Sequence, residues 1–161
     1  YNCSITSIKI PSNVSKIDRN AFSNCRDLKS IEFPINSKLN EIKECCFEYT
    51  DLEKLLIPSS IEKIDHSAFA YCNNLKKVSF GQDSKIQIIG NGVFKCTNIQ
   101  SISFPSSVLN VGMNCFENCM MIQIIEITEN IDITVFYNNS YVNIYYRTND
   151  FLLMIPNQDN N

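Results

Sequence analysis

A short hydrophobic pattern repeats along almost the whole sequence. Its most regular part is a pair of apolar residues separated by one other residue, and successive pairs lie about 23 or 24 residues apart until a shorter last step. The pairs are Ile8/Ile10, Ile31/Phe33, Leu55/Ile57, Val78/Phe80, Ile102/Phe104, Ile125/Ile127 and Ile144/Tyr146. Self-similarity at a fixed period is typical of repeat proteins. The sequence therefore predicts a stack of similar units.

Each unit carries the signals of a strand, a corner and a second short strand. Apolar residues at alternate positions are typical of a strand with one buried face, and the proline or glycine that follows the pair would end it. Asp18 and Asp65 stand where the N-cap of a brief helical turn is expected. Gly90 and Gly112 are predicted to mark a corner with positive φ. Because one such unit cannot bury its own apolar face, the units must stack into a solenoid.

A phenylalanine and a cysteine recur at fixed places in the units. The phenylalanines are Phe22, Phe47, Phe69, Phe94, Phe116 and Phe136, and the cysteines are Cys25, Cys72, Cys96 and Cys119, with Cys3 in the first, incomplete unit. Cysteine often behaves as a small buried hydrophobe, so the repeat predicts columns of packed rings and thiols. We expect all eight thiols to be reduced and Cys45 to be the most exposed. Four disulfides are the alternative.

Three stretches show the unit most fully: IPSSIEKIDHSAFAYC (57–72), NLKKVSF (74–80) and SISFPSSVLNVG (101–112). They resemble the treponemal-type leucine-rich repeat of BspA-like proteins, and the resemblance runs from about residue 1 to residue 136. It implies an α/β fold, a right-handed leucine-rich-repeat solenoid with a parallel sheet on the concave face and short second strands and helical turns on the other side. An array of about six units would cover residues 1–146, and residues 147–161 would form a C-terminal cap and polar tail.

The charge of the chain narrows the range of partners. A net charge of −3 argues against nucleic acid or an acidic membrane surface as the main partner. Lys54, Lys76 and Lys77 could form a small basic spot, although the acidic residues between them favour an ordinary solvated surface. The longest apolar run, residues 151–155, is far shorter than the ~20 residues of a membrane span, so we expect no membrane insertion by this segment. The chain starts at Tyr1 rather than methionine, which suggests a piece of a longer protein.

Nothing in the sequence assembles a catalytic or metal site. His66 is the only histidine, and a nucleophile needs both a base and a group that orients the base. The nearest approach to a zinc-binding pair is Cys115 with Cys119, whose positions are already explained by packing. We therefore expect a non-enzymatic protein without cofactor or metal, with His66 on the surface.

The predicted binding surface is the outward face of the concave sheet. Its candidate protein-binding residues are Lys9, Glu32, Lys54, Leu56, Lys77, Ile124, Glu126 and Tyr145. Ile124 and Tyr145, on an otherwise polar face, are the predicted hot spot, although single exposed apolar residues often have no role. Seven strands at a spacing of ~4.8 Å give a surface about 30 Å long, which suits a protein partner better than a small metabolite.

Three sequons, at Asn2, Asn13 and Asn138, could accept N-linked glycans if the chain passes through a eukaryotic secretory route. Asparagine is so frequent in this sequence that about this many sequons would arise by chance. Asn13, in the turn after Pro11, is the best candidate.

The resemblance implies a function as well as a fold. BspA-like proteins are, as a family, cell-surface or secreted proteins of mucosal bacteria and parasitic protists, implicated in adhesion to host proteins and extracellular matrix. The chain is therefore expected to be a protein-binding module, an adhesin or surface antigen, with a host or matrix protein as its ligand. A cytoplasmic repeat scaffold and a regulatory repeat domain of a larger protein are the alternatives. The sequence makes no prediction about the oligomeric state.

Overall fold

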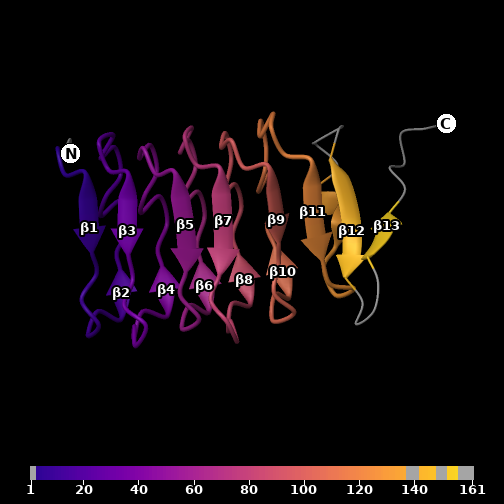
Figure 1. Ribbon diagram of the computed structural model, residues 1–161, viewed down its shortest axis with the longest axis horizontal. Coiled ribbons are helices and arrows are strands. Elements are labelled where there is room, and N and C mark those ends of the chain that lie inside the picture. Colours follow the sequence, from indigo (N-terminus) through magenta and orange to yellow (C-terminus); the bar gives the residue numbers. More distant parts are fainter. Residues whose placement is uncertain (1–2, 137–141, 148–151, 156–161) are drawn as a thin grey trace.

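The chain winds as a solenoid of about six turns in the computed structural model, which describes residues 3–136, 142–147 and 152–155. One row of parallel strands runs along its long axis and is called the main sheet (Figure 1). Its strands are β1 (Ser7–Lys9), β3 (Ser30–Glu32), β5 (Lys54–Ile57), β7 (Lys77–Phe80), β9 (Ser101–Ser103), β11 (Ile124–Ile127) and β12 (Asn143–Arg147). Strand pairing is continuous within β1–β3, β5–β7 and β9–β11–β12, and these three groups lie side by side.

A second parallel sheet follows the main sheet along the solenoid (Figure 1). It consists of two-residue strands in sequence order: β2 (Lys16–Ile17), β4 (Glu41–Ile42), β6 (Lys63–Ile64), β8 (Ile88–Ile89) and β10 (Asn110–Val111). The last residue of each strand is an isoleucine or a valine and is buried, so each unit also sends one apolar side chain from this sheet into the core.

The strand registers pair equivalent positions of successive units. Ile8 lies opposite Ile31 in β1 and β3, and Leu55 lies opposite Val78 in β5 and β7. Ile125 is likewise opposite both Ile102 and Ile144. The repeat period read from the sequence is therefore confirmed residue by residue, because a shift of one residue would turn the apolar positions outward.

The corners of the described units contain none of the predicted helical turns. Within the described ranges the one helix is a short 3-10 element, η1 (Ile133–Phe136), and the corners are runs of hydrogen-bonded turns, so the α/β assignment was wrong. The N–H of Phe22 donates to the carbonyl of Cys46, and the N–H of Asn24 donates to the carbonyl of Glu48, both in the next unit and both at 2.8 Å. An α-helix would need these groups for its own i→i−4 bonds. Stacking between units therefore replaces the helix.

The glycines at the corners have a different role from the one predicted. Gly92 has φ of 61°, and the equivalent position holds Asn20, Cys45, Ser67 and Asn114 at φ of 58°, 52°, 53° and 58°. Gly90 and Gly112 have no such φ, so that expectation was wrong. A Cβ added to Gly112 would lie 2.4 Å from the backbone nitrogen of Asn91, and one added to Gly90 would lie 2.8 Å from that of His66. Close approach between adjacent turns is what excludes a side chain at both positions.

The phenylalanine column is confirmed. Its members are Phe22, Phe47, Phe69, Phe94, Phe116 and Phe136, and the centroids of successive rings lie 5.1, 5.3, 6.0, 5.7 and 6.1 Å apart. All except the half-buried Phe22 are fully buried. These distances lie within the range of favourable ring pairs, so each unit contributes one ring to a stack that runs along the core.

The thiol column is a mixed column of cysteine and threonine. The third residue after successive phenylalanines is Cys25, Thr50, Cys72, Thr97 and Cys119. The Thr50 hydroxyl donates to the Phe47 carbonyl (2.9 Å) and lies 3.2 Å from Sγ of Cys72. Thr97 makes the same two contacts, at 2.8 and 3.3 Å, with Phe94 and Cys119. Cys96 stands one residue earlier and is half-buried, so its predicted place in this column was wrong.

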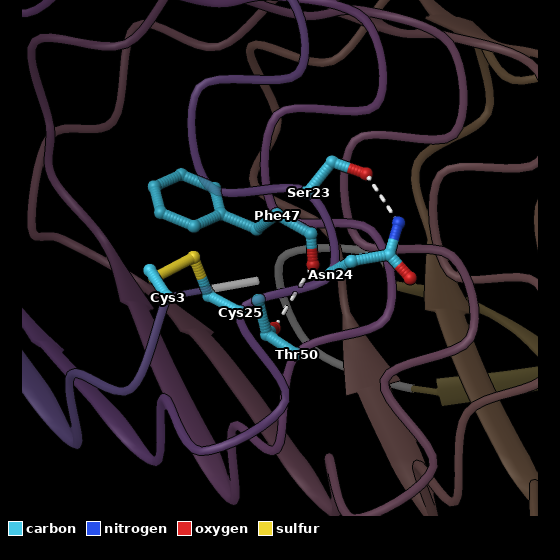
Figure 2. Close-up of a disulfide and its surroundings, with 6 residues drawn as sticks. All are labelled: Cys3, Ser23, Asn24, Cys25, Phe47 and Thr50. Carbon is cyan, nitrogen blue, oxygen red and sulfur yellow. Dashed lines mark hydrogen bonds between the residues drawn. A yellow bond between two sulfur atoms is a disulfide. The ribbon is translucent and has the colours of Figure 1, made fainter. Parts of the chain in front are cut away.

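Cys3 and Cys25 form a disulfide, with their Cα atoms 4.9 Å apart (Figure 2). The expectation that all eight thiols are reduced was therefore wrong. The Cys3–Cys25 pair corresponds to the Thr50–Cys72 pair later in the array, and the two residues of each pair are 22 residues apart. Cys3 takes the position of Thr50, so a sulfur replaces the hydroxyl that contacts the cysteine of the next unit. The other six thiols are free: Cys46, Cys72, Cys115 and Cys119 are buried, and Cys45 shares its partial exposure with Cys96.

The array ends in a hairpin rather than in a further parallel turn. β13 (Leu152–Ile155) pairs antiparallel with β12, with Ile144 opposite Ile155 and Arg147 opposite Leu152. β13 lies within the longest apolar run of the sequence, residues 151–155. The boundary placed at residue 146 stays a prediction, and the polar tail at 157–161 lies outside the described residues.

Candidate protein-binding face

The outward residues of the main sheet form two columns, as the alternation of the strands predicts. One column is Ser7, Ser30, Lys54, Lys77, Ser101, Ile124 and Asn143, and the other is Lys9, Glu32, Leu56, Ser79, Ser103, Glu126 and Tyr145. These residues are exposed or half-buried, whereas the central residues between them, such as Leu55, Ile102 and Ile125, are buried. All eight candidate residues therefore lie on one face, here called the main-sheet face.

Charges at the two ends of this face are neutralised locally. Lys9 Nζ lies 2.8 Å from Glu32 Oε1 across the β1–β3 ladder. Glu126 forms an ion pair with Arg147 at the end of β12. Both acidic residues of the main-sheet face are thus already paired with a basic side chain.

The centre of the face is different. Lys54 and Lys77 are directly opposite each other in the β5–β7 ladder, and both are exposed. Neither makes an ion pair with any acidic side chain in the described part of the chain. The sequence-based view of Lys54, Lys76 and Lys77 as one ordinary solvated spot did not foresee this arrangement. We call Lys54 and Lys77 the lysine pair.

The apolar candidates lie at two separate places. Leu56, with 58% of its surface exposed, is two residues after Lys54 on β5. Ile124 (37% exposed) and the half-buried Tyr145 lie diagonally on β11 and β12, because Ile124 is opposite Asn143 and Tyr145 is opposite Glu126. The structure therefore brings Ile124 and Tyr145 together and keeps Leu56 with the lysine pair.

A hollow of about 340 Å³ lies on the main-sheet face where β7 and β9 run next to each other without strand pairing. Its walls include Lys76, Lys77 and Glu126, and Ser101 and Ser103 form part of its lining. Nothing in the sequence indicated a hollow here, because serines read as inert surface. Short side chains beside an unpaired seam leave this space open.

A second surface cluster was not foreseen. Tyr49 and Tyr71 occupy equivalent corner positions, two residues after Phe47 and Phe69, and their rings stack with centroids 4.5 Å apart. The guanidinium of Arg26 lies 5.9 Å from the centre of the Tyr49 ring. With Asp51 these groups line an open hollow of about 210 Å³. The repeat alignment could have revealed the tyrosine pair, since both tyrosines share one position of the unit.

The remaining predictions concern His66, a metal and the membrane. His66 is exposed as predicted, and its Nδ1 accepts a hydrogen bond from the Asn91 N–H at 2.9 Å. In the portion that the structure describes, no three His, Cys, Asp or Glu side chains cluster closely enough to hold a metal ion. A search of the same portion finds no helix with the length and apolar character that crossing a membrane requires.

Of the three sequons, only Asn13 lies among the described residues. It is exposed in a turn, as predicted. Asn2 and Asn138 lie outside the described residues, so their candidacy as glycosylation sites stays a prediction from the sequence.

Stacked units with a leucine or isoleucine core, parallel strands and one open face define a leucine-rich-repeat solenoid. The pattern of the BspA type leucine rich repeat region matches the chain in six copies, over residues 1–123 and 83–150. The chain therefore belongs to the BspA-type leucine-rich-repeat family. No catalytic family is indicated.

Two solved structures are similar to this one. The pneumococcal vaccine antigen PcpA is 31% identical over 78% of this chain, with a TM-score of 0.72. A Treponema pallidum leucine-rich-repeat protein (TpLRR) is 23% identical over 76% of this chain, with a TM-score of 0.70, and this likeness supports the fold alone. The matched parts cover 31% of the PcpA chain and 58% of the TpLRR chain. No curated protein sequence shows a significant match.

Proposed function

We propose that this chain is a non-enzymatic protein-binding module of a cell-surface or secreted protein, an adhesin or surface antigen that contacts host or matrix proteins. The similarity to the pneumococcal vaccine antigen, at 31% identity and a TM-score of 0.72, is the observation that carries the proposal. The binding surface is the main-sheet face. Its length of about 30 Å, from seven strands at ~4.8 Å, can accommodate a protein footprint of roughly 800 Å².

The disulfide favours an exported protein over a cytoplasmic scaffold. Disulfides persist in oxidising compartments and are rare in the cytosol, where thiols are kept reduced. Cys3 and Cys25 form one between the first, incomplete unit and the unit that follows it. A cytoplasmic location would therefore require an exception to the usual distribution of disulfides.

The location can be tested by antibody staining of intact, non-permeabilised source cells. We expect surface staining that disappears after brief digestion with an external protease, while an intracellular control protein survives the digestion. Staining that needs permeabilisation would contradict the proposal and favour the intracellular scaffold. The same cells, once permeabilised, provide the control for antibody reactivity.

A further inference from the structure

The lysine pair departs from a rule that the other charged strand registers follow. Lys9 is opposite Glu32, and Glu41 is opposite both Lys16 and Lys63, so these charged neighbours have opposite signs. Among the described strands, the exception is the register of β5 and β7, in which two like charges, Lys54 and Lys77, lie directly opposite each other. Like charges directly opposite each other destabilise a sheet.

The fold does not require lysine at these two positions. The equivalent places in the same column hold Ser7, Ser30 and Ser101, in strands with the same register. The main-sheet face offers no described carboxylate to neutralise the pair, because Glu32 and Glu126 have other partners. Two uncompensated positive charges thus lie at the centre of the face, although the whole chain carries a net charge of −3.

We propose that the lysine pair and Leu56 form a docking site for an extended acidic segment of a partner protein. One carboxylate of the segment binds between the ammonium groups of Lys54 and Lys77, which relieves their repulsion. An apolar side chain two residues along the segment covers Leu56, since alternate residues of an extended chain face the same side. The hollow beside Lys77 is lined by Ser101 and Ser103, whose hydroxyls can donate to the continuing chain, and by Glu126, whose charge is already paired with Arg147.

The exposure of Leu56 favours a protein segment over a sulfated glycan. A glycan supplies anionic groups for the lysines but no apolar group for a leucine with 58% of its surface exposed. The inference rests on the proposed function, because it assigns the chemistry of the partner that the main-sheet face binds.

The test uses a fluorescein-labelled peptide of repeated Glu-Ser-Leu-Ser units, with fluorescence anisotropy as the readout. The double variant Lys54→Ser/Lys77→Ser introduces the residue that the same column uses elsewhere. Its matched control, Lys38→Ser/Lys85→Ser, removes two exposed loop lysines and the same total charge. Circular dichroism and thermal melting confirm that both variants fold.

We expect the wild-type chain to bind the peptide with an affinity that falls as salt is added. Each exposed ion pair contributes a factor of about two to five, so Lys54→Ser/Lys77→Ser should weaken binding about tenfold. The control variant should bind like the wild type, and a Gln-Ser-Leu-Ser peptide should bind poorly. Equal binding by both double variants, or no preference for glutamate over glutamine, would overturn the proposal.

Binding of a heparin hexasaccharide is measured in parallel, to distinguish a sulfated glycan from an acidic protein segment as the ligand of the lysine pair. Binding of heparin through the lysine pair, without binding of the glutamate peptide, would replace the acidic protein segment with a sulfated glycan and so overturn the proposal. Failure here is distinct from failure of the proposed function. If Ile124→Asp/Tyr145→Ala abolishes binding to a matrix protein while Lys54→Ser/Lys77→Ser leaves it unchanged, the main-sheet face binds protein and this inference is wrong.

Discussion

Buried thiols make the core sensitive to alkaline pH. Burial raises the pKa of the Cys46 thiol to about 12 and that of Cys72 to about 11, and it also raises the pKa of Cys115. In the unfolded chain these thiols ionise near pH 8.5 (roughly), so above that pH the unfolded state loses protons that the folded state keeps. The contribution of these thiols to the free energy of unfolding should therefore be constant below about pH 8 and fall as the pH rises toward 11.

Chemical denaturation at a series of pH values checks this prediction. The variant Cys46→Ala provides the control, because Ala21 and Ala68 occupy the same position of the unit. Above pH ~9 the wild type should lose stability more steeply than Cys46→Ala, by up to roughly 1 kcal/mol per pH unit. Parallel pH profiles for the two proteins would show that Cys46 is not buried as described.

The number of reactive thiols follows from the disulfide and from burial. Without reductant, titration of the unfolded chain with a thiol reagent should yield six free thiols, and eight after reduction. In the folded chain Cys45 and Cys96 should react before the other four thiols, which are buried, and Cys45 should react slowly because partial burial raises its pKa to about 11. A count of eight before reduction would contradict the Cys3–Cys25 disulfide.

A single ring of the phenylalanine column carries much of the stability of its turn. Phe69 is fully buried and stacks on Phe47 and Phe94. Phe69→Ala should lower the free energy of unfolding by about 3–5 kcal/mol, since it removes the ring and leaves a cavity. Leu109→Ala, at a half-exposed position, should change it by less than about 0.5 kcal/mol. Equal denaturation midpoints for these two variants would count against the stacking register.

At the scale of the elements, the cysteine–threonine column shows where further cross-links fit. Thr50 and Cys72 are separated by 22 residues, as are Cys3 and Cys25, and their side chains are already 3.2 Å apart. Thr50→Cys should therefore form a second disulfide with Cys72. By the chain-entropy account, a disulfide that closes a loop of this length raises the free energy of unfolding by about 3 kcal/mol. Loss of the threonine hydroxyl's hydrogen bond lowers it by about 1 kcal/mol.

Mass spectrometry of the oxidised Thr50→Cys protein identifies the bond, and thermal melting measures its effect. The midpoint should rise in the oxidised protein and return to the wild-type value or below when reductant is added. Thr50→Ser, which keeps a hydroxyl, is the control and should melt at nearly the same temperature in both conditions. If the introduced thiol of the Thr50→Cys variant stays free after oxidation, the alignment of Cys3 with Thr50 is contradicted.

The strands were predictable because their signal is local, whereas the corners depend on neighbouring units. Alternating apolar residues and a following proline identified the main-sheet strands and their register. The expected helical turn failed because the N–H of Phe22, which would close the first turn on Asp18, bonds to the next unit instead, and the sequence of one unit cannot reveal this. The position of Cys96 was misjudged by one residue because threonine was not considered as a member of the same column.

At the scale of the whole molecule, strand alternation in the sequence predicted that the eight candidate protein-binding residues share the outward side of the main sheet, but it did not predict which of them are neighbours. Alternation alone puts Lys54, Leu56 and Lys77 outward. The direct opposition of the two lysines depends on the register between units, and the hollow beside Ser101 depends on the missing pairing between β7 and β9. The opposition of the two lysines and the hollow beside them therefore could not be predicted from the sequence alone.

Protein binding by the main-sheet face can be tested by comparing the two faces of the solenoid in one experiment. Surface plasmon resonance against a panel of immobilised extracellular-matrix proteins would be recorded for the wild type, for the main-sheet variant Ile124→Asp/Tyr145→Ala, and for a second-sheet variant, Ile88→Asp/Leu109→Ala. Ile88 lies in β8, Leu109 directly precedes β10, and both side chains are exposed. We predict that at least one matrix protein binds the wild type and the second-sheet variant equally, and binds the main-sheet variant much more weakly. Loss of binding in the second-sheet variant alone, or binding to no matrix protein, would contradict the proposed function.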